Sequence, residues 1–209
     1  MLRTTWMALV LCVSAHANPK GSITGTVTAE GGGKPLVVYI EKADPPAKAP
    51  TERPKVEQRN TRFNPEVVVV RQGQTLEFPN LDKFYHNVFS VTPGNEFDLG
   101  LYRGGVSKTA TLDQPGEIDV YCNIHPEMAA KILVLQNDYF AEAAADGSFT
   151  IANLPPGNYT LVAWSARHEP QKKPIEVKAG AALKVSFALK PRKAATHLNK
   201  NGEQYGRYK

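Results

Sequence analysis

The sequence predicts an all-β protein built from two β-sandwiches, one of which is inserted in the other. Short runs of alternating apolar and polar residues recur along the chain, and no segment sustains a helical period. Glycine and proline are plentiful, with 16 residues of each, as expected where many turns join short strands. A chain of 209 residues is long enough for one large or two small domains.

The first 17 residues have the pattern of a secretory leader. Arg3 supplies a positive charge, residues 6–13 are apolar, and Ala15-His16-Ala17 fits a small-x-small cleavage site. We expect cleavage after Ala17 and export to the periplasm or beyond. A buried N-terminal strand and a lipid anchor at Cys12 are the alternatives. No apolar run reaches the roughly 20 residues that a membrane-spanning helix needs.

Residues 18–42 are expected to begin the outer sandwich. A strand with threonines at alternate positions is followed by a glycine turn at 31–33 and by a second strand over 36–40, a pattern that predicts a β-hairpin. Residues 43–55 contain four prolines and no apolar cluster, which is typical of a linker.

Residues 56–136 form the predicted inserted sandwich, where the strand pattern is denser. Val67 to Val70 are wholly apolar, and Ile118, Val120 and Cys122 share one parity of a later strand. Because side chains of a strand alternate between its faces, Cys122 is expected to leave this strand on the apolar side.

Residues 137–190 return to the hairpin pattern, with turns at 146–147 and 155–158, and are expected to complete the outer sandwich. Residues 191–209 are basic and have few apolar anchors, which predicts a solvated, flexible tail. The alternative is an electrostatic contact of this tail with an acidic partner or an anionic membrane surface. The formal charge of the chain is +5, and nothing in the sequence is typical of nucleic-acid recognition.

The chemistry of the chain concentrates in C-N-I-H-P-E-M, residues 122–128. Outside the leader, Cys122 is the only cysteine and Met128 the only methionine, with His125 between them. Thiolate, imidazole and thioether together suit a copper site that cycles between Cu(I) and Cu(II). A lone thiol in an oxidising compartment is a chemical liability, and a metal bond would explain its presence. His86 lies just before a predicted strand that begins at Asn87, and it is the best candidate for a fourth ligand.

Other interpretations of these residues are weaker. A single histidine is usually a surface residue and a single methionine usually fills a core, but their occurrence together with the only thiol is harder to explain in that way. Structural zinc favours more thiolates and gains little from methionine. His168 and His197 lie beyond the inserted sandwich. Because the sequence has no His-x-His pair, it lacks the ligands of a multicopper cluster, and we do not expect an enzyme.

Residues 56–136 resemble the cupredoxins, a family of Greek-key β-sandwiches that includes plastocyanin, azurin and amicyanin. The resemblance rests on F-N-P-E-V-V-V-V-R-Q-G-Q-T-L-E-F-P-N, H-N-V-F-S and P-G-E-I-D-V-Y-C-N-I-H-P-E-M, and the C-x-x-H-x-x-M spacing is that of amicyanin. It implies one type 1 copper ion and an asparagine that braces the ligand loops and donates a backbone hydrogen bond to the cysteine sulfur. The implied ligands and this asparagine are His86, Cys122, His125, Met128 and Asn87. Glu127 departs from the apolar residue of amicyanin, which puts a purely apolar docking face around His125 in doubt.

The flanking segments resemble a smaller carboxypeptidase-regulatory-like β-sandwich, through G-S-I-T-G-T-V-T and D-G-S-F-T-I-A-N-L-P-P-G-N-Y-T-L-V-A-W. The combination resembles exported bacterial plastocyanin-like proteins, some of them labelled as methylamine-utilisation proteins. The expected function is one-electron transfer with a redox protein partner. Two alternatives stay open, namely a periplasmic copper carrier or chaperone and a structural or adhesive β-sandwich module.

Overall fold

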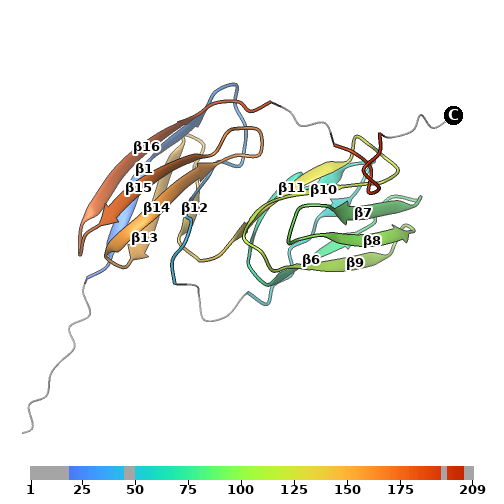
Figure 1. Ribbon diagram of the computed structural model, residues 1–209, viewed down its shortest axis with the longest axis horizontal. Helices are drawn as coiled ribbons and strands as arrows, with labels where there is room; N and C mark the ends of the chain where they lie inside the picture. Colours follow the sequence, from blue (N-terminus) through green and yellow to red (C-terminus); the bar gives the residue numbers. More distant parts are fainter. Residues whose placement is uncertain (1–18, 45–49, 194–196, 205–209) are drawn as a thin grey trace, which may run out of the picture.

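The computed structural model describes residues 19–44, 50–193 and 197–204, and every regular element in these ranges is a β-strand (Figure 1). The predicted leader lies outside the described residues. None of the described segments forms a helix that could cross a bilayer. The strands in chain order are β1 (Gly21–Ala29), β2 (Val37–Ile40), β3 (Glu57–Gln58), β4 (Phe63–Asn64), β5 (Val67–Arg71), β6 (Gln74–Pro79), β7 (His86–Ser90), β8 (Phe97–Tyr102), β9 (Ser107–Leu112), β10 (Gly116–Tyr121), β11 (Ala129–Leu135), β12 (Phe140–Glu142), β13 (Ser148–Leu154), β14 (Gly157–Trp164), β15 (Gln171–Val177) and β16 (Ala182–Leu189).

The outer unit consists of two sheets whose strands come from both ends of the described chain (Figure 1). One sheet has the order β13-β1-β16 and the other the order β12-β2-β14-β15. Strand β1 runs parallel to β16 over all but its first residue, from Ser22 opposite Ala182 to Ala29 opposite Leu189. Residues 21–40 therefore complete sheets that are otherwise built from residues after 139.

The predicted hairpin between the first two strands is wrong. Strand β1 lies between β13 and β16, whereas β2 lies between β12 and β14 in the opposite sheet. Ile23 of β1 and Ile40 of β2 are both buried in one apolar core, so the strands pack face to face instead of side by side. The glycine turn at 31–33, with all three φ angles positive, carries the chain from one sheet to the other.

The inner unit is formed by the strands between these two halves. Its main sheet has the order β5-β11-β10-β7-β8, and the pairs β6-β9 and β3-β4 complete it. Along β6, buried and half-buried residues alternate, as the apolar pattern predicts. The end of the predicted linker is attached to this strand, since the amide of Val56 donates to the carbonyl of Glu77, and that of Glu77 to Pro54. Residues 45–49 of the linker lie outside the described ranges.

The two units share an apolar and ionic junction. Val37 and Trp164 of the outer unit pack with Leu133 and Leu135 of β11 in a separate buried cluster. The indole Nε1 of Trp164 donates to Glu117 of β10 at 2.6 Å. Because Trp164 is almost fully buried, this bond satisfies a donor that would otherwise be costly. The junction thus fixes the outer unit against the sheet that carries the candidate site.

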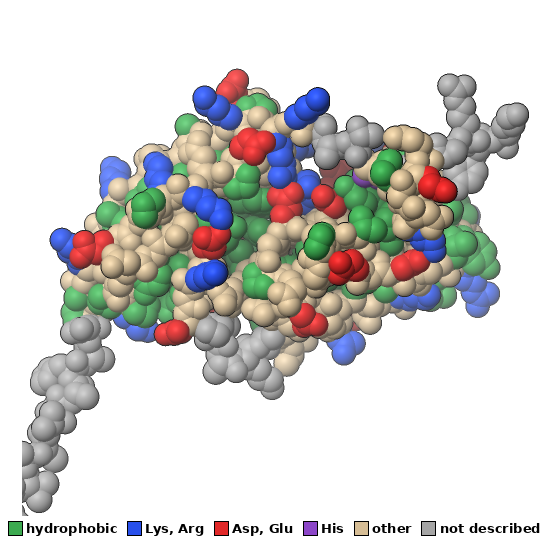
Figure 2. Space-filling view, viewed as in Figure 1, with side chains coloured by type: hydrophobic (Ala, Val, Ile, Leu, Met, Phe, Trp, Pro, Cys, Tyr) green, Lys and Arg blue, Asp and Glu red, His purple; other side chains and the backbone are tan. Residues whose placement is uncertain are grey.

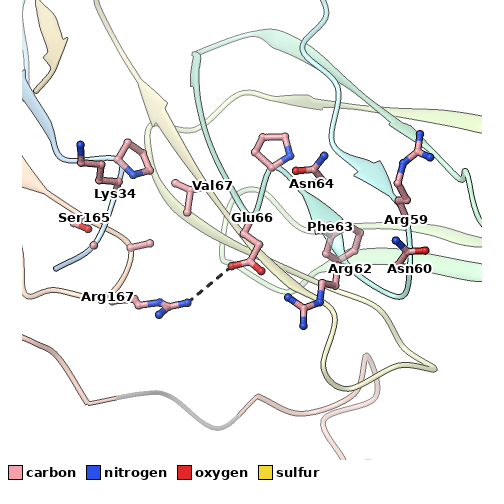
Figure 3. Close-up of a pocket in the computed structure, with 14 residues that line it drawn as sticks. Lys34, Arg59, Asn60, Arg62, Phe63, Asn64, Glu66, Val67, Ser165 and Arg167 are labelled. Carbon is pink, nitrogen blue, oxygen red and sulfur yellow. Dashed lines mark ion pairs between the residues drawn. The ribbon is translucent and has the colours of Figure 1, made fainter. Parts of the chain in front are cut away.

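Charged side chains of both signs surround this junction, and on the face seen in Figure 2 they are mixed instead of segregated. A hollow of about 750 Å³ opens between the units (Figure 3). Arg167 of the outer unit lies 3.9 Å from Glu66 of the inner unit across it. Since both side chains are largely exposed, this ion pair contributes little to stability.

The C-terminal segment differs from the solvated, flexible tail that the sequence predicts. Of residues 191–209, the described part returns to the inner unit and contacts it through Arg192, His197 and Lys200. The segment lies against the inner unit because that unit provides hydrogen-bond acceptors and an aromatic ring for these residues. An excess of basic residues alone could not reveal this pairing.

Candidate metal centre

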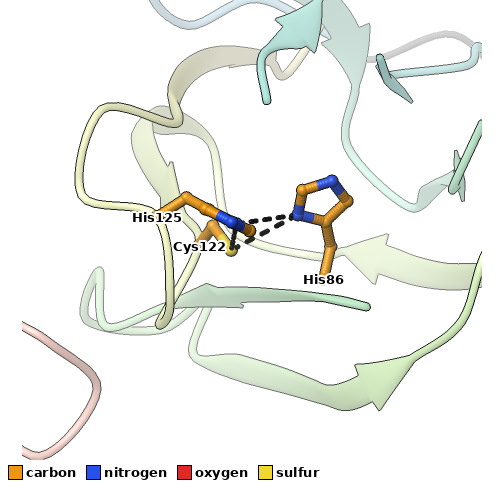
Figure 4. Close-up of side chains that lie close together, drawn as sticks. All are labelled: His86, Cys122 and His125. Carbon is orange, nitrogen blue, oxygen red and sulfur yellow. Dashed lines mark hydrogen bonds between the residues drawn. The ribbon is translucent and has the colours of Figure 1, made fainter. Parts of the chain in front are cut away.

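Three of the four predicted ligands meet at one end of the inner unit (Figure 4). His86 is the first residue of β7, Cys122 directly follows β10, and His125 lies in the loop to β11. One nitrogen of each imidazole and the Cys122 sulfur all lie within 4.8 Å of one another. His86 and Cys122 are fully buried, while His125 is half-buried.

The three atoms form a triangle of the size that one metal ion requires. Nδ1 of His86 and Nδ1 of His125 are 3.0 Å apart, and they lie 3.9 Å and 3.7 Å from Sγ of Cys122. The circumradius of a triangle with these sides is about 2.1 Å, which is close to the lengths of metal bonds to imidazole and thiolate. The residues present therefore fit a trigonal His₂Cys site.

Met128 closes the ligand loop. Its amide donates to the carbonyl of His125 at 3.0 Å, and its carbonyl accepts from the amide of Cys122 at 3.2 Å. Its side chain is fully buried in the same apolar cluster as Cys122. These bonds hold the seven residues of the loop in a compact turn before β11 begins.

Asp82 orients the His86 ring, and the sequence analysis did not identify it. Its Oδ2 accepts from Nε2 of His86 at 2.8 Å, so that Nδ1 faces Cys122. The amides of Asn60 and Thr61 donate to the same carboxylate. Burial opposes the charged form, but these hydrogen bonds, that of His86 above all, lower the pKa of Asp82. A Cβ at Gly104 would lie 2.0 Å from the Asp82 carbonyl, so a side chain there would displace this segment.

The Cys122 thiol is held in surroundings that favour its ionised form. Burial raises its pKa, but a hydrogen bond with His86 and backbone hydrogen bonds from Asn87, Ile124 and His125 outweigh that effect and lower it. Burial likewise lowers the pKa of His86, and its bonds with Cys122 and Asp82 reverse the sign and raise it. A thiolate close to two imidazoles is a ready metal ligand.

Asn87 connects the two ligand-bearing segments, as the resemblance implied. Its side-chain Oδ1 accepts from the backbone amide of Asn123 at 3.3 Å, and the backbone amide of Asn87 donates to the Cys122 sulfur. Its Nδ2 donates to Asp98 of β8 at 2.6 Å. The side chain is almost fully buried, so these bonds are not shared with bulk water.

His125 forms the accessible edge of the site. Burial and the nearby charge of His86 lower its pKa. The exposed ring of Phe84 packs against both histidines, with centroids 5.1 Å from His86 and 5.7 Å from His125. Leu81 and Tyr85, in the same segment, are also exposed. The half-buried imidazole is thus bordered by apolar groups on the side of this segment.

The other two described histidines lie outside this cluster. His168 is buried at the junction, and its Nε2 lies 2.9 Å from the carbonyl of Glu30. His197 stacks on Tyr121, the residue before Cys122, with ring centroids 4.1 Å apart. Among the described residues, only His86, Cys122 and His125 form a group of potential metal ligands of this kind.

Comparison with known proteins gives similarities for both parts of the chain. The family model of the Carboxypeptidase regulatory-like domain matches residues 127–190. This agrees with the predicted resemblance of the second flanking segment, although the match begins ten residues before the predicted boundary at 137 and so includes β11. No curated protein sequence matches the chain.

The similar solved structures include several cupredoxins. A purple cupredoxin from Nitrosopumilus maritimus is 17% identical, with 39% of this chain and 98% of that chain covered, at a TM-score of 0.36. A reduced amicyanin variant is 19% identical, with coverage of 48% and 99% and a TM-score of 0.38. A copper-containing nitrite reductase from Thermus scotoductus SA-01 is 23% identical, with coverage of 54% and 28% and a TM-score of 0.40.

Proposed function

We propose that this chain is a mononuclear type 1 copper protein that transfers single electrons. The observation that carries the proposal is the triangle of Nδ1 of His86, Nδ1 of His125 and Sγ of Cys122, whose ligand atoms already lie within 4.8 Å of one another. A ligand set that is assembled and buried before the metal arrives lowers the cost of ordering it on binding. The site would hold one copper ion.

The chemistry of the donors favours copper over other metals. One thiolate and two imidazoles in a trigonal arrangement, with a thioether as a weak axial ligand, are the ligands of electron-transfer copper sites. His86, Cys122 and His125 would hold the ion, and Met128 would supply the thioether. Zinc has no comparable use for a methionine ligand. Bound copper would supply a one-electron change between Cu(I) and Cu(II).

The residues around the ligands support electron transfer more than copper carriage. Asp82 fixes the His86 ring, Asn87 fixes the loop that bears Cys122, and two backbone bonds close that loop. Such a framework changes little between oxidation states, which favours rapid electron exchange. A carrier would instead need to release its ion readily, and two of the three ligands in this cluster are fully buried.

Electrons would leave and arrive at the edge of His125. This imidazole is half-buried, and the exposed rings of Phe84 and Tyr85 lie on the same segment as His86. A redox protein that covers this edge would exclude water and shorten the path to Cys122. Glu127 is exposed in the ligand loop and makes this face partly acidic. We infer no substrate turnover, and the partner is a redox protein.

Export completes the proposal. The charged start, apolar run and Ala-x-Ala motif of residues 1–17 support cleavage and delivery to the periplasm or beyond. In that compartment a lone thiol such as Cys122 would otherwise be open to oxidation, and a metal bond would protect it. N-terminal sequencing of protein recovered from the cell envelope should begin at or near Asn18, and uncleaved cytoplasmic protein would contradict export.

The decisive experiment is a visible absorption spectrum after Cu(II) is added to the metal-free protein, followed by voltammetry. The expected result is an intense blue or green thiolate-to-copper band at one copper per chain, with a reversible one-electron couple. A colourless complex that loses copper to a mild chelator would support the carrier instead. Failure to bind copper would leave only the structural or adhesive alternative.

A further inference from the structure

The described end of the chain, residues 197–204, forms a defined turn. Oδ1 of Asn199 accepts from the amides of Asn201 and Glu203 at 2.9 Å and 3.0 Å. The backbone of Asn199 also exchanges hydrogen bonds with Glu203 and Gly202. Gly202 has a φ of 78°, in the left-handed region where glycine is favoured. Asn-x-Asn-Gly thus builds a rigid turn at this point.

This turn presents Lys200 to the inner unit at two points. The Lys200 amide donates to Oδ1 of Asn123 in the ligand loop at 3.0 Å. Its Nζ donates to Oδ2 of Asp98 on β8 at 2.7 Å. One residue of the C-terminal segment therefore joins a strand beside the metal centre to the loop that carries Cys122.

These contacts close a ring of hydrogen bonds around Asn87. Nδ2 of Asn87 donates to the second oxygen of Asp98 at 2.6 Å, and Oδ1 of Asn87 accepts from the amide of Asn123 at 3.3 Å. The ring runs from Lys200 through Asp98, Asn87 and Asn123 back to Lys200. Because the Asn87 amide hydrogen-bonds to the Cys122 sulfur, this ring fixes the residue that contacts the thiolate.

His197 makes a second contact with the same loop. Its ring stacks on Tyr121 with an interplanar angle of 5°, and it also hydrogen-bonds to the Pro126 carbonyl. Tyr121 and Pro126 lie on either side of Cys122 in the sequence. Upstream, Arg192 anchors the segment by two bonds from Nη2 to the carboxylate of Glu117, at 2.8 Å and 2.9 Å.

The electrostatic consequence is local. Lys200 places a positive charge against Asp98, whose carboxylate would otherwise carry an unbalanced charge one hydrogen bond away from Asn87. Both side chains are more than a third exposed, so the pair contributes little to global stability. Its effect is therefore expected on the position and the charge surroundings of the thiolate instead of on folding.

We propose that residues 197–204 hold the ligand loop of the metal centre in position. Lys200 would be a positioning residue for Asn87 and Asn123, and His197 would restrain the same loop through its contacts with Tyr121 and Pro126. The redox consequences rest on the proposed copper function, whereas the bracing of the loop does not depend on any metal. The outer unit, which sends this segment back to the site, would in this way take part in setting the properties of the copper centre.

The bracing is tested on the full-length, metal-free protein by amide hydrogen exchange. In the double variant Asn199→Ala/Lys200→Met, the turn and the Asp98 contact are both lost. Amides of residues 121–128 should then exchange roughly tenfold faster, as expected when one or two hydrogen bonds cease to hold a loop. The matched control Asn158→Ala/Lys184→Met changes the same residue types at exposed positions of the two outer-unit strands β14 and β16. Unchanged exchange in the first variant would overturn the proposal.

The redox consequence is tested on the copper-loaded protein. In Lys200→Met, the uncompensated Asp98 charge favours Cu(II), so the reduction potential should fall while the colour stays. Lys200→Arg should restore it, and Lys184→Met should leave it unchanged. An unchanged potential in Lys200→Met would overturn the positioning role. If hydrogen exchange in residues 121–128 speeds up but no coloured copper site forms, the proposed copper function is wrong, whereas the positioning of the ligand loop by residues 197–204 is supported.

Discussion

Oδ2 of Asp82 lies 2.8 Å from Nε2 of His86, while Nδ1 of the same ring faces the sulfur of Cys122 at 3.9 Å. A carboxylate on the outer nitrogen of a ligating histidine fixes both the tautomer and the plane of the ring. Asp82 is in turn held by the amides of Asn60 and Thr61, so that it is a fixed acceptor.

Replacing Asp82 should therefore weaken the metal site without unfolding the protein. In Asp82→Ala, copper affinity should fall by about 10- to 100-fold, the range typical for loss of such a partner. Competition with a chelator of known strength measures this change. The exposed Asp113 offers a control of the same charge, and Asp113→Ala should leave affinity unchanged. Equal affinity of both variants would contradict the role of Asp82.

The two sulfur ligands should respond differently to substitution. Cys122→Ser removes the thiolate whose bond to copper gives the colour, so the visible band should disappear. Met128→Gln replaces a weak thioether by a harder oxygen donor, which favours Cu(II), so copper and colour should stay while the potential falls. Visible spectra and voltammetry of both variants measure this. A colourless Met128→Gln protein would contradict an axial role.

The histidines can be separated in the same way. His86→Ala should strongly reduce copper retention, because among the described residues only His86 and His125 provide imidazole ligands to the group around Cys122, and no third histidine joins it. His168→Ala should leave the copper site unchanged, although it removes a buried contact with the Glu30 carbonyl and so should lower the unfolding temperature. Metal analysis after dialysis and thermal unfolding of each variant separate these effects. Loss of copper from His168→Ala alone would refute the ligand assignment.

The site was largely predictable because its signal is local. Cys122, His125 and Met128 lie within seven residues, and their chemistry makes them candidate ligands without knowledge of the fold. Asp82 was missed because a carboxylate four residues before a histidine is common, and only the fold shows that the two side chains meet. Lys200 was missed for the same reason, although the turn signal in Asn199-Lys200-Asn201-Gly202 was present.

The fold was predictable in class but not in pairing. Alternation along Ile23 to Val27 identifies a strand, but it says nothing of which sheet that strand joins. Pairing with the distant β16 depends on contacts about 160 residues away, so a short turn at 31–33 was wrongly taken to join neighbours. The predicted flexible tail differs from the structure for a related reason, because an excess of basic residues does not reveal a specific partner such as Asp98.

Glu117 at the junction predicts a pH dependence of stability. Burial raises its pKa, but hydrogen bonds from Arg192, Lys131 and Trp164 outweigh burial and lower it below the usual 4.5. A carboxyl group whose pKa is lower in the folded state than in the unfolded state stabilises the protein at pH values above the unfolded-state pKa. This contribution is lost as the pH falls through the folded-state pKa. The unfolding temperature of Glu117→Gln should therefore lie below that of the unchanged protein at pH 7, and the difference should shrink below about pH 4.5. Glu176→Gln, at an exposed position of β15, is the matched control and should leave the unfolding temperature at pH 7 nearly unchanged.

The strand pairing predicts which fragments of the chain fold. We propose that residues 56–136 are an autonomous unit, because the strands β3 to β11 pair only with one another. A fragment of residues 18–136 adds β1 and β2 without β12 to β16, so the buried side chains Val38 and Ile40 would lose their partners. Unpaired edges and exposed apolar faces promote association.

The fragment of residues 56–136 should therefore be monomeric and unfold cooperatively, whereas that of residues 18–136 should aggregate or unfold with a broad transition. The shorter fragment does expose Leu133 and Leu135, which pack on the outer unit in the intact chain, so it should be less stable than the full-length protein. Size-exclusion chromatography and thermal unfolding of both fragments provide the comparison. If the longer fragment proves as soluble and as cooperative as the shorter one, residues 18–42 do not depend on the C-terminal strands, and the two sandwiches are not nested in the way that the strand order indicates.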